Sequence, residues 1–217
     1  MRQSSAVAAM AELCRIYWYP LYAYVRRRGH DQHAAEDLTQ EFFACLLARD
    51  FLAGIDRQKG KFRSFLLTCM QHFLADQWDR TQAQKRGGGR KIIPLDGLDA
   101  ETRYRLEPAE AMTPEKLFER QWALMVLERV LSRLEQQWAA SGKAQLFVAL
   151  KKTLGGERPE RYAAIAASLG MTEGAVKMAA HRLRRRYREL VREEIAHTVA
   201  SPEEVEDEIR YLLTCLN

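Results

Sequence analysis

The chain of 217 residues lacks any long hydrophobic run and contains few cysteines. No stretch approaches the run of about twenty apolar residues that is needed to cross a bilayer. Glu12 and Arg15 interrupt the alanine-rich start too early for the core of a signal peptide. The four cysteines include no CxxC pair, which excludes the usual zinc spacing and gives no disulfide framework. We therefore expect a reduced, cytoplasmic setting.

The sequence also contains almost no segment with the alternating pattern of a β-strand. Apolar residues recur at helical spacing nearly everywhere, and a hydrophobic content of 47% is normal for a folded protein. Nothing resembles a catalytic triad, a pair of catalytic carboxylates or a metal centre. His30, His33 and Glu36 have a superficial metal-ligand spacing, but they lie where a loop enters a helix, without a further ligand nearby. We expect an all-α protein that is not an enzyme and holds no cofactor or metal.

The net charge of +5 conceals an uneven distribution along the chain. Residues 1–90 carry a net charge of +5 and residues 141–198 a net charge of +6. Residues 91–140 carry −2 and residues 199–217 carry −4. Two basic blocks beside acidic ones point to a polyanionic partner such as nucleic acid. Two solvated charged surfaces would give the same pattern, so charge alone leaves both interpretations open.

A stretch rich in glycine and proline divides the chain. Residues 86–97 read RGGGRKIIPLDG, and a polar run continues to Pro108. The three glycines lack the GxxxxGK[ST] spacing of a phosphate loop. We predict two small helical domains joined by a flexible linker, followed by a tail. The predicted boundaries are 8–86 for the first domain, 87–113 for the linker, 114–198 for the second domain and 199–217 for the tail.

Residues 161–183 of the second domain read RYAAIAASLGMTEGAVKMAAHRL and predict two helices joined by a tight turn. The first helix has one buried face, formed by Tyr162, Ile165, Ala166 and Leu169. Gly170 can end that helix in the left-handed conformation. Thr172 is a natural N-cap for the next helix. A connection of about three residues is typical of a helix-turn-helix.

The second helix of this pair has a basic face beside its buried stripe. The stripe consists of Val176, Ala180, Leu183, Tyr187 and Leu190. The candidate DNA-contacting residues are Thr172, Glu173, Gly174, Lys177, Met178, His181, Arg182, Arg184, Arg185 and Arg188. Polar groups near a helix start suit base edges in the major groove, and arginines further along suit phosphates. The alternative is a helical hairpin whose basic face is only solvated, but the combination of cap, glycine turn and basic column favours DNA binding.

The periodicity of the first domain predicts buried faces on its helices. The first helix is rich in aromatic residues, namely Tyr17, Trp18, Tyr19, Tyr22 and Tyr24. The second has an apolar face of Leu38, Phe42, Phe43 and Leu46. A long buried stripe follows, made of Phe62, Phe65, Leu66, Cys69, Phe73, Leu74 and Trp78.

Three segments resemble motifs of one known family. Residues 36–43 read EDLTQEFF, and residues 62–78 read FRSFLLTCMQHFLADQW. These segments resemble the EDLxQExF and FRxWLxxIxxNxxxD signatures of bacterial sigma factors, and the predicted helix-turn-helix resembles that of the same family. The motifs occur in the family's order, over about residues 13–198. A linker without an extra domain resembles the layout of the extracytoplasmic-function class.

The resemblance implies roles for residues of the first domain. In the family an acidic face docks on the clamp helices of the largest RNA polymerase subunit, and here that face is Glu36, Asp37, Gln40 and Glu41. The positions matching those that capture flipped bases of the minus-ten element are Gln71 and His72. Phosphate contacts would come from Lys61, Arg63, Arg80, Lys85, Arg86 and Arg90. From the residues alone, the acidic groups also suit a helix N-terminus, and Gln71 and His72 suit an ordinary polar helix surface.

The tail predicts a short, acidic amphipathic helix. Residues 201–204 read SPEE, a capping box with proline at the first helical position. The apolar face consists of Val205, Ile209, Leu212, Leu213 and Leu216. We expect this helix to dock on a basic domain of its own chain, and docking on a partner is the alternative.

Together these features predict a sigma factor of the extracytoplasmic-function class. It would bind core RNA polymerase and direct it to promoter DNA, reading the minus-ten element with the first domain and the minus-thirty-five element with the second. An anti-sigma partner is usual in that class. The alternatives are a helix-turn-helix repressor that does not engage polymerase, and a protein that sequesters polymerase without reading DNA. The acidic helix argues against the first alternative and the basic column against the second.

Overall fold

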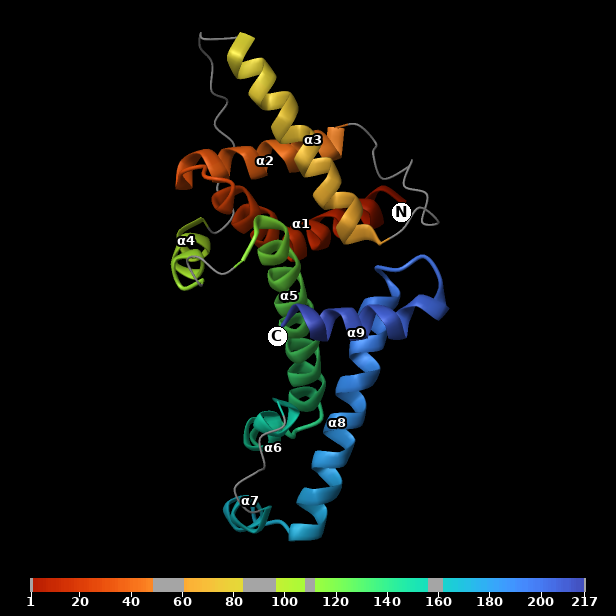
Figure 1. The fold of residues 1–217 in the computed structure, drawn as a ribbon. Coiled ribbons are helices and arrows are strands. Elements are labelled where there is room, and N and C mark those ends of the chain that lie inside the picture. Colours follow the sequence, from red (N-terminus) through yellow and green to blue (C-terminus); the bar gives the residue numbers. More distant parts are fainter. Residues whose placement is uncertain (1, 49–60, 84–96, 108–111, 156–161, 217) are drawn as a thin grey trace.

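The computed structural model describes residues 2–48, 61–83, 97–107, 112–155 and 162–216, and all regular structure in these ranges is helical (Figure 1). The prediction of an all-α fold is confirmed. In chain order the helices are α1 (Arg2–Arg27), α2 (Gln32–Ala48), α3 (Phe62–Ala83), α4 (Gly97–Arg105), α5 (Pro114–Ala140), α6 (Ala144–Leu150), the 3₁₀ helix η2 (Lys151–Gly155), α7 (Tyr162–Leu169), α8 (Glu173–Ala196), the 3₁₀ helix η3 (Pro202–Glu204) and α9 (Val205–Cys215).

Helices α1, α2 and α3 pack together through aromatic and aliphatic side chains. The rings of Tyr17 and Phe62 meet edge to face at 5.5 Å between centroids, and those of Phe42 and Phe73 at 5.7 Å. Such edge contacts add to the free energy gained by burying the rings. The apolar faces predicted for α1 and α2 are therefore the ones that pack in the structure.

The buried stripe predicted for α3 is wrong at its end. Trp78 is 65% exposed, whereas Met70, which the prediction omitted, is fully buried. Figure 1 shows the physical reason: the C-terminal end of α3, beyond the residues that contact α2, extends away from α1 and α2.

The polar run assigned to the linker contains a helix that packs on α1. The carboxylate of Glu101 in α4 is buried and accepts hydrogen bonds from Arg26 Nη2 at 2.9 Å, Arg26 Nε at 3.0 Å and the Tyr22 hydroxyl at 2.5 Å. The bonds from Arg26 and Tyr22 lower the pKa of Glu101 to about 2, against the opposing effect of burial. Residues 97–105 are thus a docked helix, held by a buried ion pair together with apolar contacts of Ala100 and Tyr104.

Helix α5 lies at the centre of the molecule (Figure 1). The side chain of Thr113 caps its start by accepting from the Lys116 amide at 3.3 Å, and Pro114 occupies the first turn. The first half of α5 packs on α1, and its second half packs beside α6 and α8. The buried side chains of both predicted domains consequently form one continuous cluster. The boundary between linker and second domain stays a prediction.

Charged groups reinforce the contact between α5 and α8. The carboxylate of Glu194 in α8 is buried and pairs with Arg129 Nε at 2.7 Å and Arg133 Nη1 at 3.2 Å. Removing one partner of such a buried pair leaves an uncompensated charge, so these pairs fix how the two helices are aligned.

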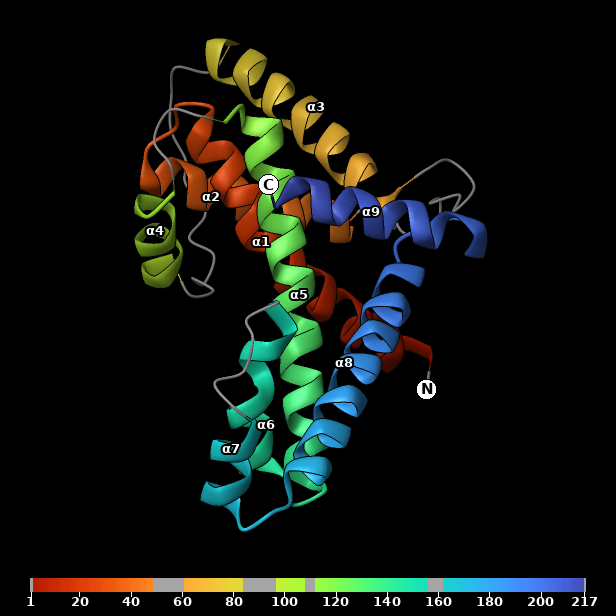
Figure 2. The same ribbon diagram turned by 60° about the horizontal axis from the view of Figure 1, so that its bottom comes forward.

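The tail forms η3 and α9, and α9 docks on its own chain, across α5 and α8 (Figure 2). The predicted cap is wrong in detail: the Ser201 side chain makes no capping hydrogen bond, and Glu204 accepts from the Ala200 amide at 3.1 Å instead. The predicted apolar face is wrong at Leu213, which is 54% exposed. Leu212 and, unexpectedly, Glu208 are buried.

Candidate nucleic-acid interface

The predicted pair of helices in the second half of the chain is formed by α7 and α8, joined by three residues. Gly170 has φ of +63°, the left-handed conformation that ends α7, and the Met171 amide donates to the Ala166 carbonyl at 2.9 Å. Thr172 has extended backbone, and its Oγ1 accepts from the Ala175 amide at 3.2 Å. Each of these local features agrees with the sequence prediction.

The buried stripe of α8 fixes which side of the helix faces solvent. Val176, Ala180, Leu183 and Leu190 are all fully buried. The opposite surface presents the candidate DNA-contacting residues, all exposed except for the half-buried Arg184: Thr172, Glu173, Gly174, Lys177, Met178, His181, Arg182, Arg184, Arg185 and Arg188. Met178, with 58% exposure, is a large apolar side chain on this otherwise polar face. The structure therefore brings the predicted column together on one open surface.

Two ion pairs within α8 lie on this surface. Lys177 Nζ is 2.7 Å from Glu173 Oε1, and Arg185 Nε is 2.9 Å from Glu189 Oε1. The hydrogen bond from Lys177 to Glu173 raises the pKa of Lys177. Exposed pairs of this kind contribute little stability, typically about 0–1 kcal/mol, so a phosphate can replace the carboxylate at small cost.

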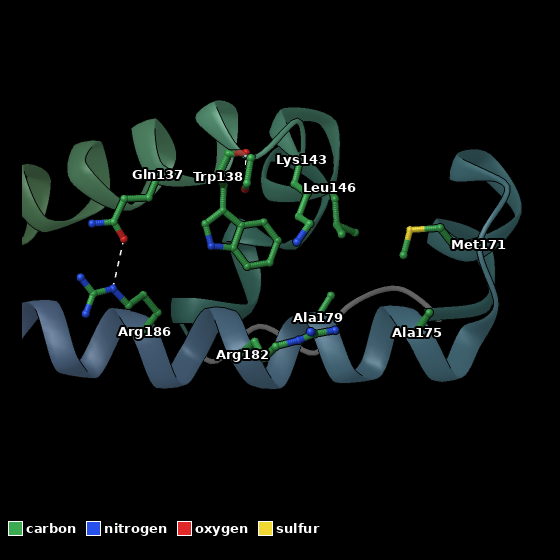
Figure 3. Close-up of a pocket in the computed structure, with 10 residues that line it drawn as sticks. Gln137, Trp138, Lys143, Leu146, Met171, Ala175, Ala179, Arg182 and Arg186 are labelled. Atoms are coloured by element: carbon green, nitrogen blue, oxygen red, sulfur yellow. Dashed lines mark hydrogen bonds between the residues drawn. The ribbon is translucent and has the colours of Figure 1, made fainter.

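A cavity of about 310 Å³ lies between the end of α5, the start of α6 and the first half of α8 (Figure 3). Trp138, Leu146 and Met171 line its apolar part. Arg186 Nε donates to Gln137 Oε1 at 3.1 Å at one end. Arg182 lines this cavity as well, so its stem lies at the edge of the exposed column and not at its centre.

The acidic face predicted on α2 is displayed at the surface. The helix begins at a turn in which Gly29 has φ of +96° and Asp31 Oδ1 accepts from the Ala34 amide at 2.8 Å. Asp37 and Glu41 are exposed, and Glu36 and Gln40 are half-buried. Glu36 accepts from Gln32 Nε2 at 3.0 Å, and Glu41 from Gln77 Nε2 of α3 at 2.7 Å. The four residues thus form one acidic patch, in which hydrogen bonds hold the side chains of Glu36 and Glu41 in place.

The residues predicted to contact the minus-ten element are separated into an open and a covered group. Gln71 and His72 are exposed on α3, on the part of the helix that leads to Trp78. Lys61 and Arg63 at the start of α3 instead pair with Glu208 of α9, and the side chain of Arg63 is only 4% exposed while that of Lys61 is 32% exposed. Lys85, Arg86 and Arg90, and the side chain of Arg80, lie outside the described residues.

The sequence analysis missed Glu208, whose carboxylate in α9 is fully buried against Lys61 and Arg63. A signal for it was present, because Glu208 lies three residues after Val205 and four before Leu212, on the apolar side of the helix. An acidic residue in an apolar stripe indicates a cationic partner on the surface that the stripe covers.

The described residues were also searched for metal sites and membrane-spanning helices. Among the residues that the structure describes, no group of three or more His, Cys, Asp or Glu side chains is arranged to hold a metal ion. None of the helices in those ranges is long and apolar enough to span a membrane.

Comparison with known proteins finds one match, in the first part of the chain. Residues 17–84 match the family model of Sigma-70 region 2, which covers the C-terminal part of α1, all of α2 and all of α3. The match covers less than half of the chain and supports a sigma-70 type of RNA polymerase-binding segment over these residues. No curated protein and no solved structure matches the chain.

Proposed function

We propose that this protein is a sigma factor of the extracytoplasmic-function class, which binds core RNA polymerase in the cytoplasm, directs it to promoters and starts transcription there. The main support for the proposal is the match of residues 17–84 to Sigma-70 region 2. The exposed basic face of α8 is the second observation in its favour. The order of the segments along the chain supports the same conclusion.

The patch on α2 is the proposed contact with polymerase. Its two exposed carboxylates, Asp37 and Glu41, suit a basic partner surface, since complementary charge speeds encounter and fixes orientation. Glu36 and Gln40 flank them on the same patch. An anti-sigma partner is usual in this class and stays an expectation.

Helix α8 is the proposed reader of the minus-thirty-five element, within a second domain over residues 114–198. Its N-terminal end, with Glu173, Gly174 and Lys177, would enter the major groove, where side chains reach base edges. The absence of a side chain at Gly174 allows close approach of the backbone. Arg184, Arg185 and Arg188, further along, would contact phosphates and set the register of the helix on DNA.

Helix α3 is the proposed reader of the minus-ten element, within a first domain over residues 8–86. Gln71 and His72 are exposed polar groups for hydrogen bonding to an unpaired base. Trp78 adds an exposed indole, and stacking of a base on an aromatic ring is worth about 1–3 kcal/mol. Flipping a base costs a few kcal/mol, so such contacts are needed to offset it.

The proposal is tested by recovering genomic DNA fragments with the full-length protein, alone and after mixing with core polymerase. A sigma factor recovers a set of promoter fragments that depends on the polymerase. Recovery of the same fragments in both samples would instead identify a repressor that acts without polymerase, and would overturn the proposal.

A further inference from the structure

Helix α9 lies against the start of α3, where two of the cations predicted to contact DNA, Lys61 and Arg63, are found. The chain leaves the end of α8, turns through η3, and α9 then passes the start of α3 and ends beside α5 (Figures 1 and 2). The Phe62 amide donates to the Thr198 carbonyl at 3.2 Å, and Arg192 Nε pairs with Glu206 Oε1 at 2.7 Å. The first contact holds the start of α3 against the turn that follows α8, and the second holds α9 against α8.

The carboxylate of Glu208 is the centre of this contact. Its side chain is fully buried, with Oε2 at 2.5 Å from Lys61 Nζ and Oε1 accepting a hydrogen bond from Arg63 Nη1. Each carboxylate oxygen therefore has its own cation. A phosphate of nucleic acid also offers anionic oxygens to a lysine and an arginine in this manner.

Aromatic rings complete the enclosure of Arg63. Its guanidinium carbon is 4.3 Å from the ring centroid of Tyr211 and 4.8 Å from that of Trp122. Lys61 Nζ lies 5.2 Å from the Tyr211 centroid. Because Glu208 and Tyr211 are three residues apart on α9, one face of that helix contacts both cations. Departure of α9 would remove the tyrosine ring and the carboxylate together.

Stability alone does not account for an acidic residue at this position. Burying a carboxylate and its cationic partners costs several kcal/mol of desolvation, and replacing such a set by apolar residues is often neutral or stabilising. The rest of the α9 contact surface is apolar, with Leu212 buried and Val205 and Ile209 half-buried, so apolar residues at positions 63 and 208 together would extend an existing contact. A carboxylate suits a contact that must exchange with another anion.

We propose that α9 is an intramolecular competitor of nucleic acid: the carboxylate of Glu208 occupies the place of a DNA backbone phosphate on Lys61 and Arg63, and DNA reaches the start of α3 only when α9 has left. This inference rests on the proposed function, because it takes α3 to be a DNA-reading helix. The net charge of −4 on residues 199–217 opposes DNA while α9 is docked, since it lies beside the cations that DNA would contact.

The competition is measured with full-length protein and a labelled DNA duplex of random sequence. Glu208→Gln weakens the binding of α9 to the start of α3. It is expected to raise DNA affinity about tenfold, because α9 has left Lys61 and Arg63 in a larger fraction of the molecules. The logarithmic dependence of binding on salt is expected to steepen by about 2, because Lys61 and Arg63 would each neutralise one more phosphate. Asp207→Asn, an equal change of charge at a neighbouring exposed residue, is the matched control and is expected to change affinity less than about twofold.

A second variant and a second measurement separate release of α9 from change of charge or loss of folding. Leu212→Ala loosens the apolar seat at constant charge and is expected to raise DNA affinity as well. In the wild-type protein, added DNA is expected to speed hydrogen exchange at the amides of residues 205–215. These two results test the proposal even where Glu208→Gln fails to fold.

Each outcome of these experiments has a defined meaning. If the wild-type protein binds DNA but Glu208→Gln and Leu212→Ala bind no more tightly than Asp207→Asn, or if DNA slows exchange in α9, the competition does not exist and the proposed function is unaffected. If neither the wild-type protein nor any variant binds DNA in the presence or absence of core polymerase, the proposed function fails and the inference fails with it.

Discussion

At the scale of single residues, a few buried charges determine how this helical chain is arranged. Glu101 anchors α4 to α1 through Arg26 and Tyr22, and Glu194 ties α8 to α5. Each carboxylate has at least two donors, which offsets the cost of its burial. Helices whose apolar faces alone would permit several alignments are thereby fixed in one.

Replacing Glu101 by Gln is expected to destabilise the protein by about 2 kcal/mol at pH 7, because hydrogen bonds to the charged carboxylate are lost. The pKa of Glu101 falls from 4.5 to about 2 on folding, so its contribution is complete above about pH 4.5 and is lost as the pH falls toward 2. Urea denaturation of wild type and variant should therefore show a difference that shrinks on acidification. Glu128→Gln, at a half-exposed pair with Arg103, is the control and is expected to change stability by less than about 0.5 kcal/mol.

Replacing Lys177 or Arg184 by Ala is expected to weaken binding to minus-thirty-five DNA, since each removes a base or phosphate contact worth about 1–3 kcal/mol. Lys177 pairs only with exposed Glu173 in its helix, so thermal stability should change little. Lys116→Ala removes an exposed charge at the start of α5 and serves as the control in titrations of labelled promoter DNA. Unchanged affinity in both test variants would contradict the role given to α8.

At the scale of elements, the sequence predicts where a helix begins and ends more reliably than which of its side chains are buried by other helices. The bounds of α7 and α8 follow from Gly170 and Thr172, because turn and cap are decided within a few residues. The burial of Trp78 was predicted wrongly because it depends on how far α2 reaches along α3. The helix at 97–105 was missed because a buried carboxylate cannot be distinguished from a solvated one until Arg26 is placed beside it.

Two neighbouring leucines test which face of α9 packs on the rest of the protein. Leu212→Ala is expected to cost about 2–4 kcal/mol, because it empties a fully buried position. Leu213→Ala, at the neighbouring exposed position, is expected to cost less than about 0.5 kcal/mol. Thermal unfolding of the two variants distinguishes the observed face from the one predicted from periodicity, on which both leucines would matter.

The acidic patch of α2 is expected to be essential for binding polymerase. The double reversal Asp37→Lys and Glu41→Lys should abolish co-elution with core polymerase and leave DNA binding by α8 intact, because it places like charges at the contact. The matched control is Glu128→Lys with Glu135→Lys, two exposed carboxylates on α5. Co-elution that survives the reversal in α2 would show that polymerase binds elsewhere.

At the scale of the whole molecule, charge is distributed so that each proposed partner has its own surface. The acidic patch lies on α2, the open basic column on α8 and a covered basic pair at the start of α3. The sequence predicts the first two surfaces, since they depend on residues within one helix. It does not predict the covered pair, which joins residues 145 positions apart in the chain.

The central claim is that this protein directs RNA polymerase to promoters, and transcription with purified components tests it most directly. Core polymerase is incubated with genomic DNA, with and without the protein, and the 5′ ends of the transcripts are mapped. We expect new start sites that require the protein and share sequence elements near positions minus ten and minus thirty-five. Start sites that are identical with and without the protein would contradict the account.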